Sequence, residues 1–268
     1  MTLGCYTNTL SCYPGDAVDL HASAANGPCT LEVARMGRGR EVVRRIENIA
    51  IAYHETPPHP DRDGCDWPVA LALDIGKDWL SGYYDLQLTD RAGVVAHHFV
   101  CVKPPQSGPR AKAAFVLATN TYQAYNWWGG ANAYCDVTSL MAHKMPLAVA
   151  MEGAIGVLCN RRPFAPLIVA PPEDVPRLVN LRPRDFGERS WAGDRDWGRA
   201  HRPSPYDGAA GFLHKWEHVF AAWAETEGIA LDYFTDYDLD AEPDVLAGYG
   251  AMIVVGHSEY WSARQRAQ

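Results

Sequence analysis

The residues best suited to chemistry lie near the end of this 268-residue chain, directly after an apolar run. The run, residues 251–255 (AMIVV), is typical of a strand buried on both faces of a parallel sheet. After Gly256 come an imidazole, a carboxylate, a phenol and an indole, in His257, Glu259, Tyr260 and Trp261. Ligands of open α/β sheets bind beyond the carboxyl ends of the strands, so segment 256–261 is a candidate site. The alternative is a strand end with a few solvated polar residues.

A second apolar run, residues 113–118, ends in a segment that carries two further phenols, Tyr122 and Tyr125. Parallel strands deliver the loops at their carboxyl ends to one edge of the sheet. We therefore expect residues 119–130 to lie beside residues 256–261. For both tyrosines the alternative role is packing, because aromatic side chains in loops mostly bury surface area.

Composition excludes several classes of protein. The net charge of −8 argues against nucleic acid or an anionic membrane as the main partner. No run of 18 apolar residues is present, and the first residues lack the basic and apolar regions of a signal peptide. Seven scattered cysteines without close pairing fit a reducing compartment, so a cytoplasmic protein is expected.

Residues 1–104 are predicted to form an immunoglobulin-like β-sandwich domain. Short alternating segments recur between turn signals, at residues 17–22, 29–36, 68–74, 83–88 and 94–102. A proline-rich stretch, residues 104–109, is typical of a stiff linker to the next domain.

Residues 111–268 are predicted to form a doubly wound α/β domain. Buried runs at 113–118, 229–234 and 251–255 alternate with a helix over 211–227 and a short helix over 242–246. The first helix is expected to bury one apolar face, formed by Phe212, Trp216, Val219, Phe220 and Trp223. The sequence ends within a helix that no strand follows, so we expect an incomplete sheet and a fragment of a longer protein. Residues 171–210 read as a lid or a disordered insert.

Four blocks of this second region resemble the N,N-dimethylformamidase large (beta) subunit family. They are residues 118–130 (ATNTYQAYNWWGG), 162–164 (RPF), 232–239 (DYFTDYDL) and 256–261 (GHSEYW). The resemblance spans roughly residue 112 to the end, with a gap over residues 171–210. It implies hydrolysis of a small amide at a mononuclear iron ion held by two tyrosinates and one glutamate.

Carried over by position, the resemblance makes Glu259 the glutamate ligand. Tyr125 is the better match for one tyrosine ligand, with Tyr122 as the fallback. The second tyrosine position falls on Phe164, whose phenyl ring cannot coordinate a metal. His257 and Asn126 are the candidate catalytic residues.

The resemblance also implies features beyond these positions. The family's general-base glutamate lies downstream of residue 268, so poor catalysis by this chain alone is expected. A small-molecule amide substrate and a homo-oligomer or a small-subunit partner are implied as well.

The residue chemistry is consistent with this picture. Phenolate and carboxylate oxygens suit a Lewis-acidic ferric ion, which can polarise an amide carbonyl and acidify bound water. His257 could orient the glutamate or donate a proton to a developing oxyanion.

Other candidate ligands have competing explanations. Aspartates 232, 236 and 238 are more typical of helix and turn caps than of metal ligands. His214 and His218 have the i, i+4 spacing of zinc sites but no further ligands nearby, and His97 and His98 alternate across a strand.

A second class of function stays open. A non-catalytic or carbohydrate-binding member of the family could stack sugars on the aromatic loop that holds Trp127, Trp128 and Tyr134.

Overall fold

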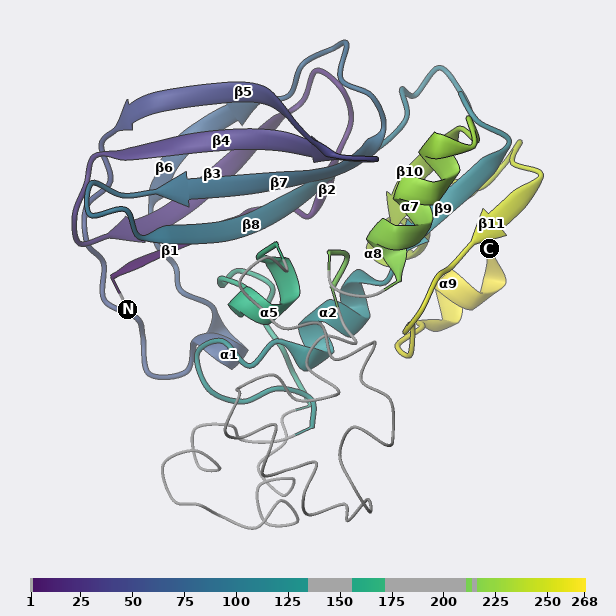
Figure 1. The fold of residues 1–268 in the computed structure, drawn as a ribbon. Helices are drawn as coiled ribbons and strands as arrows, with labels where there is room; N and C mark the ends of the chain where they lie inside the picture. The colour runs from purple at the N-terminus through teal and green to yellow at the C-terminus, as the bar shows by residue number, and fades with distance from the viewer. Residues whose placement is uncertain (1, 135–155, 172–210, 214–215) are drawn as a thin grey trace, which may run out of the picture.

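The computed structural model describes residues 2–134, 156–171, 211–213 and 216–268, and it shows a mixed α/β protein (Figure 1). The predicted insert at 171–210 lies outside these residues, except for Pro171. No helix in the described part of the chain is long and apolar enough to cross a membrane.

Two β-sheets of the N-terminal half share one hydrophobic core. One sheet has the order β1-β3-β6 and the other the order β2-β8-β7-β4-β5. Alternate side chains, such as Leu20, Leu31 and Leu86, are fully buried between them. The strands are β1 (Leu3–Thr7), β2 (Ser11–Cys12), β3 (Ala17–Ala24), β4 (Cys29–Met36), β5 (Arg40–Ile49), β6 (Val69–Asp74), β7 (Gly82–Thr89) and β8 (Val95–Val102).

All five strands predicted for this half are present, with bounds that differ by two residues or fewer. Three further strands, β1, β2 and β5, were not predicted. An immunoglobulin-like connection of these strands stays a prediction.

A parallel sheet of the order β10-β9-β11 forms the second part of the fold. It comprises β9 (Ala113–Leu117), β10 (Leu231–Thr235) and β11 (Ala251–Ile253), and Phe115 of β9 pairs with both neighbours. The predicted parallel pairing of the first and last apolar runs is therefore confirmed. β9 and β10 have the predicted burial on both faces, whereas β11 is an edge strand in which Ala251 and Met252 are exposed.

Helices cover both faces of this sheet (Figure 1). Phe115 and Tyr233 face α7 (Glu217–Thr226) and belong to a core that includes Tyr83 and Phe99 of the first sheets. The opposite face packs against α8 (Asp236–Ala241) and Trp261, which precedes α9 (Ala263–Ala267). The remaining described helices are α1 (Pro60–Asp63), α2 (Thr119–Tyr125) and α5 (Pro166–Val169). A complete doubly wound sheet stays a prediction.

The predicted core face of α7 is wrong in part. Trp216, Val219 and Trp223 are 40%, 52% and 50% exposed, whereas Ala221 and Ala224 are fully buried. Ala221 and Phe220, whose ring packs edge-on against Phe115 of β9, make the contact with the sheet. The other large apolar residues, Trp216, Val219 and Trp223, lie on the outer face. Phe212 is buried, but it precedes the helix.

The predicted short helix over residues 242–246 is also wrong, because these residues form turns. The helix of this region, α8, begins earlier. Thr235 and Asp238 form a capping box that starts α8 directly after β10.

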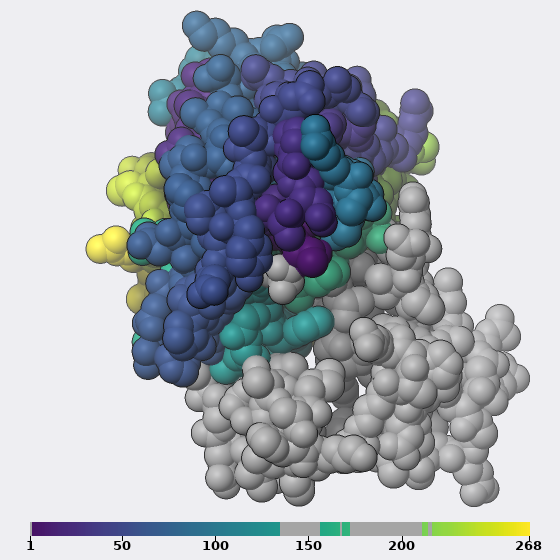
Figure 2. All heavy atoms as spheres, turned by 90° about the vertical axis from the view of Figure 1, so that its left-hand side faces the viewer, coloured from purple at the N-terminus to yellow at the C-terminus, as the bar shows by residue number. Residues whose placement is uncertain are grey.

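The two parts of the fold are joined by a buried ion pair as well as by the shared core. The Lys103 ammonium contacts Asp238 at 3.1 Å and also Glu242, and it lies 3.9 Å from the ring centre of Tyr13. Although burial opposes the charged form, these carboxylates raise the pKa of Lys103. Viewed from the left-hand side of Figure 1, the residues of the first two sheets cover most of the upper part of the molecule (Figure 2). The division at residues 104 and 111 stays a prediction.

A buried carboxyl group lies beneath α2. Glu217 accepts hydrogen bonds from the Ala118 amide, at 3.2 Å, and from the Tyr122 hydroxyl. Burial raises the pKa of Glu217 from 4.5 to about 8. Below pH 4.5 the group is protonated in both states. Between pH 4.5 and about 8 only the unfolded chain releases the proton, so the free energy of unfolding decreases as pH rises.

We expect Glu217→Gln to remove this pH dependence. Since glutamine stays neutral, the variant should gain stability over the original protein by up to ~1.4 kcal/mol per pH unit between pH 5 and 8. Denaturant unfolding across this range measures the difference, with the exposed Glu227→Gln as control. If the free energy of unfolding depends on pH in the same way in the original protein and in Glu217→Gln, Glu217 is not the group responsible.

Candidate active site

The segments that follow β9 and β11 meet at one edge of the sheet, as predicted. The Glu259 amide donates to the Thr121 hydroxyl at 3.0 Å. Nearby, the Asn120 side chain donates to the Tyr260 carbonyl at 3.1 Å. These two hydrogen bonds hold segments 119–130 and 256–261 together.

Four side chains, which we call the Tyr125–Glu259 cluster, gather at this contact: Tyr125, Tyr134, His257 and Glu259. Nε2 of His257 lies 2.9 Å from the Tyr125 hydroxyl and 3.0 Å from Oε1 of Glu259. The Tyr134 hydroxyl donates to Oε2 of Glu259. The rings of Tyr125 and Tyr134 are 4.6 Å apart.

The start of α2 is fixed by a carboxylate from another segment. Asp236, the first residue of α8, accepts hydrogen bonds from the Thr119 hydroxyl and from the Asn120 amide. Burial raises the pKa of Asp236 to about 7. Because this carboxyl group holds the first turn of α2, it helps determine where Tyr125 lies one turn later.

Gly256 makes the turn that brings His257 and Glu259 to the cluster. Its φ of 78° is in the left-handed region that favours glycine. A Cβ atom at this position would also lie 2.5 Å from the Trp216 ring. Any other residue would therefore displace either the turn or the indole.

Of the predicted site residues, Tyr125, His257 and Glu259 are brought together, whereas Tyr122 and Asn126 serve other contacts. Tyr122 is buried in the core, where its hydroxyl donates to Glu217. Burial raises the pKa of Tyr122, which leaves it a neutral phenol. Tyr125 is thus the better placed of the two tyrosines.

Asn126 is fully buried, and its amide organises the chain after α2. The carbonyl oxygen accepts from the backbone amides of Trp128, at 3.2 Å, and Ala165, at 2.9 Å. The nitrogen donates to the Pro163 carbonyl at 3.0 Å. These contacts favour a positioning role, and a catalytic role for Asn126 stays a prediction.

The segment that contains Phe164 belongs to the core. Arg162 is fully buried and donates to the carbonyls of Asn126 and Trp128. The Phe164 ring stacks on His98 with 5.4 Å between centroids. The structure therefore uses Phe164 for aromatic packing.

The hydrogen bonds of the cluster constrain its protons. A proton on Nε2 of His257 would be donated to Glu259, whereas an unprotonated Nε2 would accept from the Tyr125 hydroxyl. Burial, and then the bond to Glu259, raise the pKa of Tyr134. The Glu259 side chain remains 40% exposed and that of His257 29%, so the cluster is open to small molecules.

The donor set of the cluster fits a hard, highly charged metal ion. Phenol and carboxylate oxygens are the donors that such ions prefer, and the imidazole lies beside them. Among the described residues, no group of three or more His, Cys, Asp or Glu side chains could hold a metal. The cluster differs from such groups because part of its oxygen donors are phenolic.

The other predicted ligands have structural partners. Asp232 accepts from the amides of Arg110 and Ala111, and Asp238 caps α8, as expected for caps. His97 and His98 contact Asp85 and Thr7, respectively. His218 contacts the Gly37 carbonyl, whereas His214 lies outside the described residues.

Comparison with protein families finds one relationship that covers most of the chain. The family described as "N,N-dimethylformamidase beta subunit-like, C-terminal" matches residues 30–268. The match confirms the resemblance and begins earlier than predicted, within β4. No curated protein matches the chain.

We expect Asn126→Ala to act mainly on stability. The substitution leaves two buried backbone amides without their acceptor, at a cost of about 1–3 kcal/mol for each unsatisfied group. Urea unfolding measures this loss. Unchanged stability combined with lost hydrolysis would instead assign Asn126 to the chemistry.

Proposed function

Because this chain belongs to the N,N-dimethylformamidase beta subunit-like family, we propose that the Tyr125–Glu259 cluster is an iron-dependent amidohydrolase site. The family relationship supports an amidohydrolase-type role, and the iron and the small formamide-type substrate are our proposal. The observation that carries it is the convergence of Tyr125, His257 and Glu259 from two distant segments.

Each residue has a role that follows from its contacts. Tyr125 and Glu259 would hold the ferric ion through oxygen, and His257 would lie beside it. When bound, such an ion supplies Lewis-acid chemistry for an amide carbonyl and for water. When protonated at Nε2, His257 would donate this proton to the oxygen or nitrogen of the amide that gains electron density. The overall reaction consumes one water and yields a carboxylic acid and an amine.

The carbohydrate-binding alternative finds less support in the structure. Trp128 is 8% exposed, and it packs edge-on against Trp67 with 6.0 Å between centroids. Tyr134 is engaged with Glu259. Trp127 packs against the core. All three aromatic side chains proposed as a sugar platform thus have other contacts.

We expect Glu259→Gln to abolish both iron binding and amide hydrolysis. The substitution replaces an anionic ligand by a neutral amide of the same shape. The protein would be incubated with ferric or ferrous iron and desalted. Elemental analysis then measures bound iron, and release of formate and amine from formamide or N,N-dimethylformamide measures turnover.

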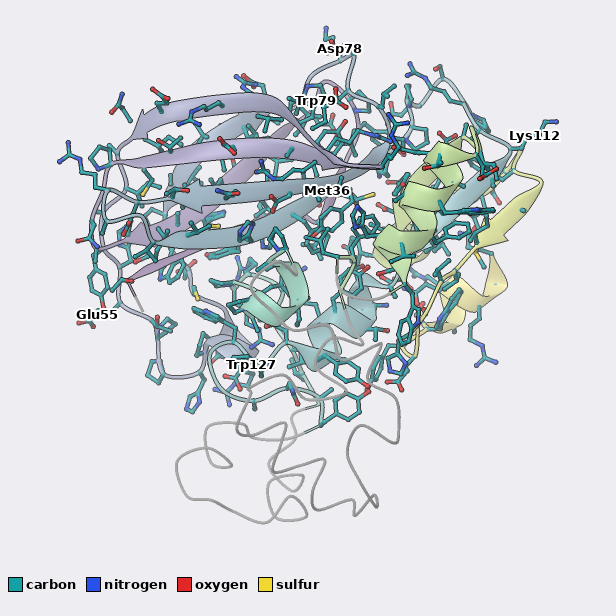
Figure 3. All side chains as sticks on the ribbon, in the orientation of Figure 1. Met36, Glu55, Asp78, Trp79, Lys112 and Trp127 are labelled. Atoms are coloured by element: carbon teal, nitrogen blue, oxygen red, sulfur yellow. The ribbon has the colours of Figure 1, made fainter. Side chains whose placement is uncertain are left out.

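The matched control is Glu55→Gln, an exposed glutamate on the far side of the molecule from α9 (Figure 3). It should leave iron content and turnover unchanged. Equal iron content in the original protein and Glu259→Gln would contradict the proposed site.

A further inference from the structure

Two cysteines that are far apart in the sequence, Cys65 and Cys159, meet beside α1. The Cys65 amide donates to the Arg161 carbonyl at 2.9 Å, and the Cys159 amide donates to the Asp61 carbonyl at 2.9 Å. The chain around Cys159 therefore lies along residues 61–65. The two thiols are also close enough to interact electrostatically.

Gly64 makes room for the sulfur of Cys159. Its φ of 83° is in the left-handed region, and a Cβ atom at this position would lie 3.0 Å from Sγ of Cys159. The sulfur thus lies against the backbone of the residue that precedes Cys65. Disulfides form between cysteines whose Cα atoms are within about 7 Å, so they need backbone segments that run side by side in this way.

Exposure distinguishes this pair from the other cysteines of the described chain. Cys159 is partly exposed, whereas the other described cysteines are buried: Cys5, Cys12, Cys29, Cys65 and Cys101. Burial raises the pKa of Cys65 to about 12, and the Arg162 guanidinium, which lies near both thiols, opposes this effect. A small oxidant in solution therefore reaches Cys159 first, and Cys65 is the neighbouring thiol that can react with the product.

We propose that Cys65 and Cys159 are a redox-responsive pair that hydrogen peroxide converts into a disulfide. The Cys159 thiol takes one oxygen atom from the peroxide and becomes a sulfenic acid, and the other oxygen leaves as water. The Cys65 sulfur then attacks the Cys159 sulfur. The S–S bond forms as the S–O bond breaks, and the hydroxyl group leaves as a second water with the proton of the Cys65 thiol. A dithiol reductant restores both thiols.

The disulfide would tie the chain after α1 to the segment that carries Arg162. The Arg162 side chain donates to the carbonyls of Asn126 and Trp128, and its Nε donates to the Cys159 carbonyl at 3.1 Å. Oxidation would therefore fix the buried guanidinium that holds the chain after α2. Because the bond also closes the long loop between the two cysteines, it restricts the unfolded chain, and the oxidised protein resists denaturant better.

Peptide mapping of the original protein tests the pair. The folded protein would be treated with hydrogen peroxide, its remaining thiols blocked with iodoacetamide, and the product digested without reductant. We expect a peptide pair joined through Cys65 and Cys159, and two fewer titratable thiols per chain. The urea midpoint of unfolding should rise and return to its starting value with dithiothreitol. Cys12→Ala, which removes a buried cysteine elsewhere, is the matched control and should keep the cross-link.

Single variants test the order of the two steps. In Cys65→Ala, Cys159 should accumulate as a sulfenic acid that dimedone labels, whereas in Cys159→Ala the buried Cys65 should stay reduced. The inference is overturned if peroxide oxidises Cys159 of the original protein without linking it to Cys65, if Cys159 links to another cysteine, or if neither thiol reacts. Since the mapping uses the original protein, this outcome does not depend on the folding of either variant.

Discussion

The hydrogen bonds of β9 to a parallel strand on each side fix the position of the whole site. β10 and β11 pair with β9 in register, and both faces of β9 are buried, so its carboxyl end has little freedom. The polar segments leave from this end. Asp236, at the end of β10, holds the start of α2, and Thr121 of α2 holds the Glu259 amide. The central strand thus positions both halves of the cluster, although it contributes no side chain to it.

The buried carboxyl groups that position α2 have an energetic cost. Glu217 and Asp236 are buried carboxyl groups whose pKa values rise to about 8 and about 7. Both lie within hydrogen-bonding distance of α2 or of the residue before it. An apolar pair would avoid the cost of burial, but it would leave the Ala118 and Asn120 amides without acceptors. The two buried acids therefore lower the stability of the fold at high pH, but they fix the position of the helix that carries Tyr125.

The sequence predicted the elements whose periodicity was unambiguous. The strands β4, β7 and β8 alternate clearly, and β9 is a continuous apolar run, so their positions followed from pattern alone. Charged β5 was missed because an exposed strand has no apolar face to detect. The apolar face of α7 was assigned wrongly at Trp216, Val219 and Trp223, because periodicity cannot tell which side of a helix meets the sheet. Tyr125, His257 and Glu259 could be predicted because each lies just beyond a strand end. Tyr134 could not be, because its partner Glu259 is 125 residues away and the intervening turn depends on tertiary contacts.

The Tyr125–Glu259 cluster is assembled from two stretches of chain and does not include the Phe164 segment. Residues 119–134 supply both phenols, and residues 256–261 supply the carboxylate and the imidazole. The 162–165 segment acts through packing and through the bonds of Arg162 and Ala165 to the chain around Asn126. Since one helix and its returning loop carry both phenols, their separation depends on local backbone contacts, such as Ala133 to Ala124. Only the carboxylate must be brought from a distant part of the chain, and the parallel pairing of β9 and β11 already provides that approach.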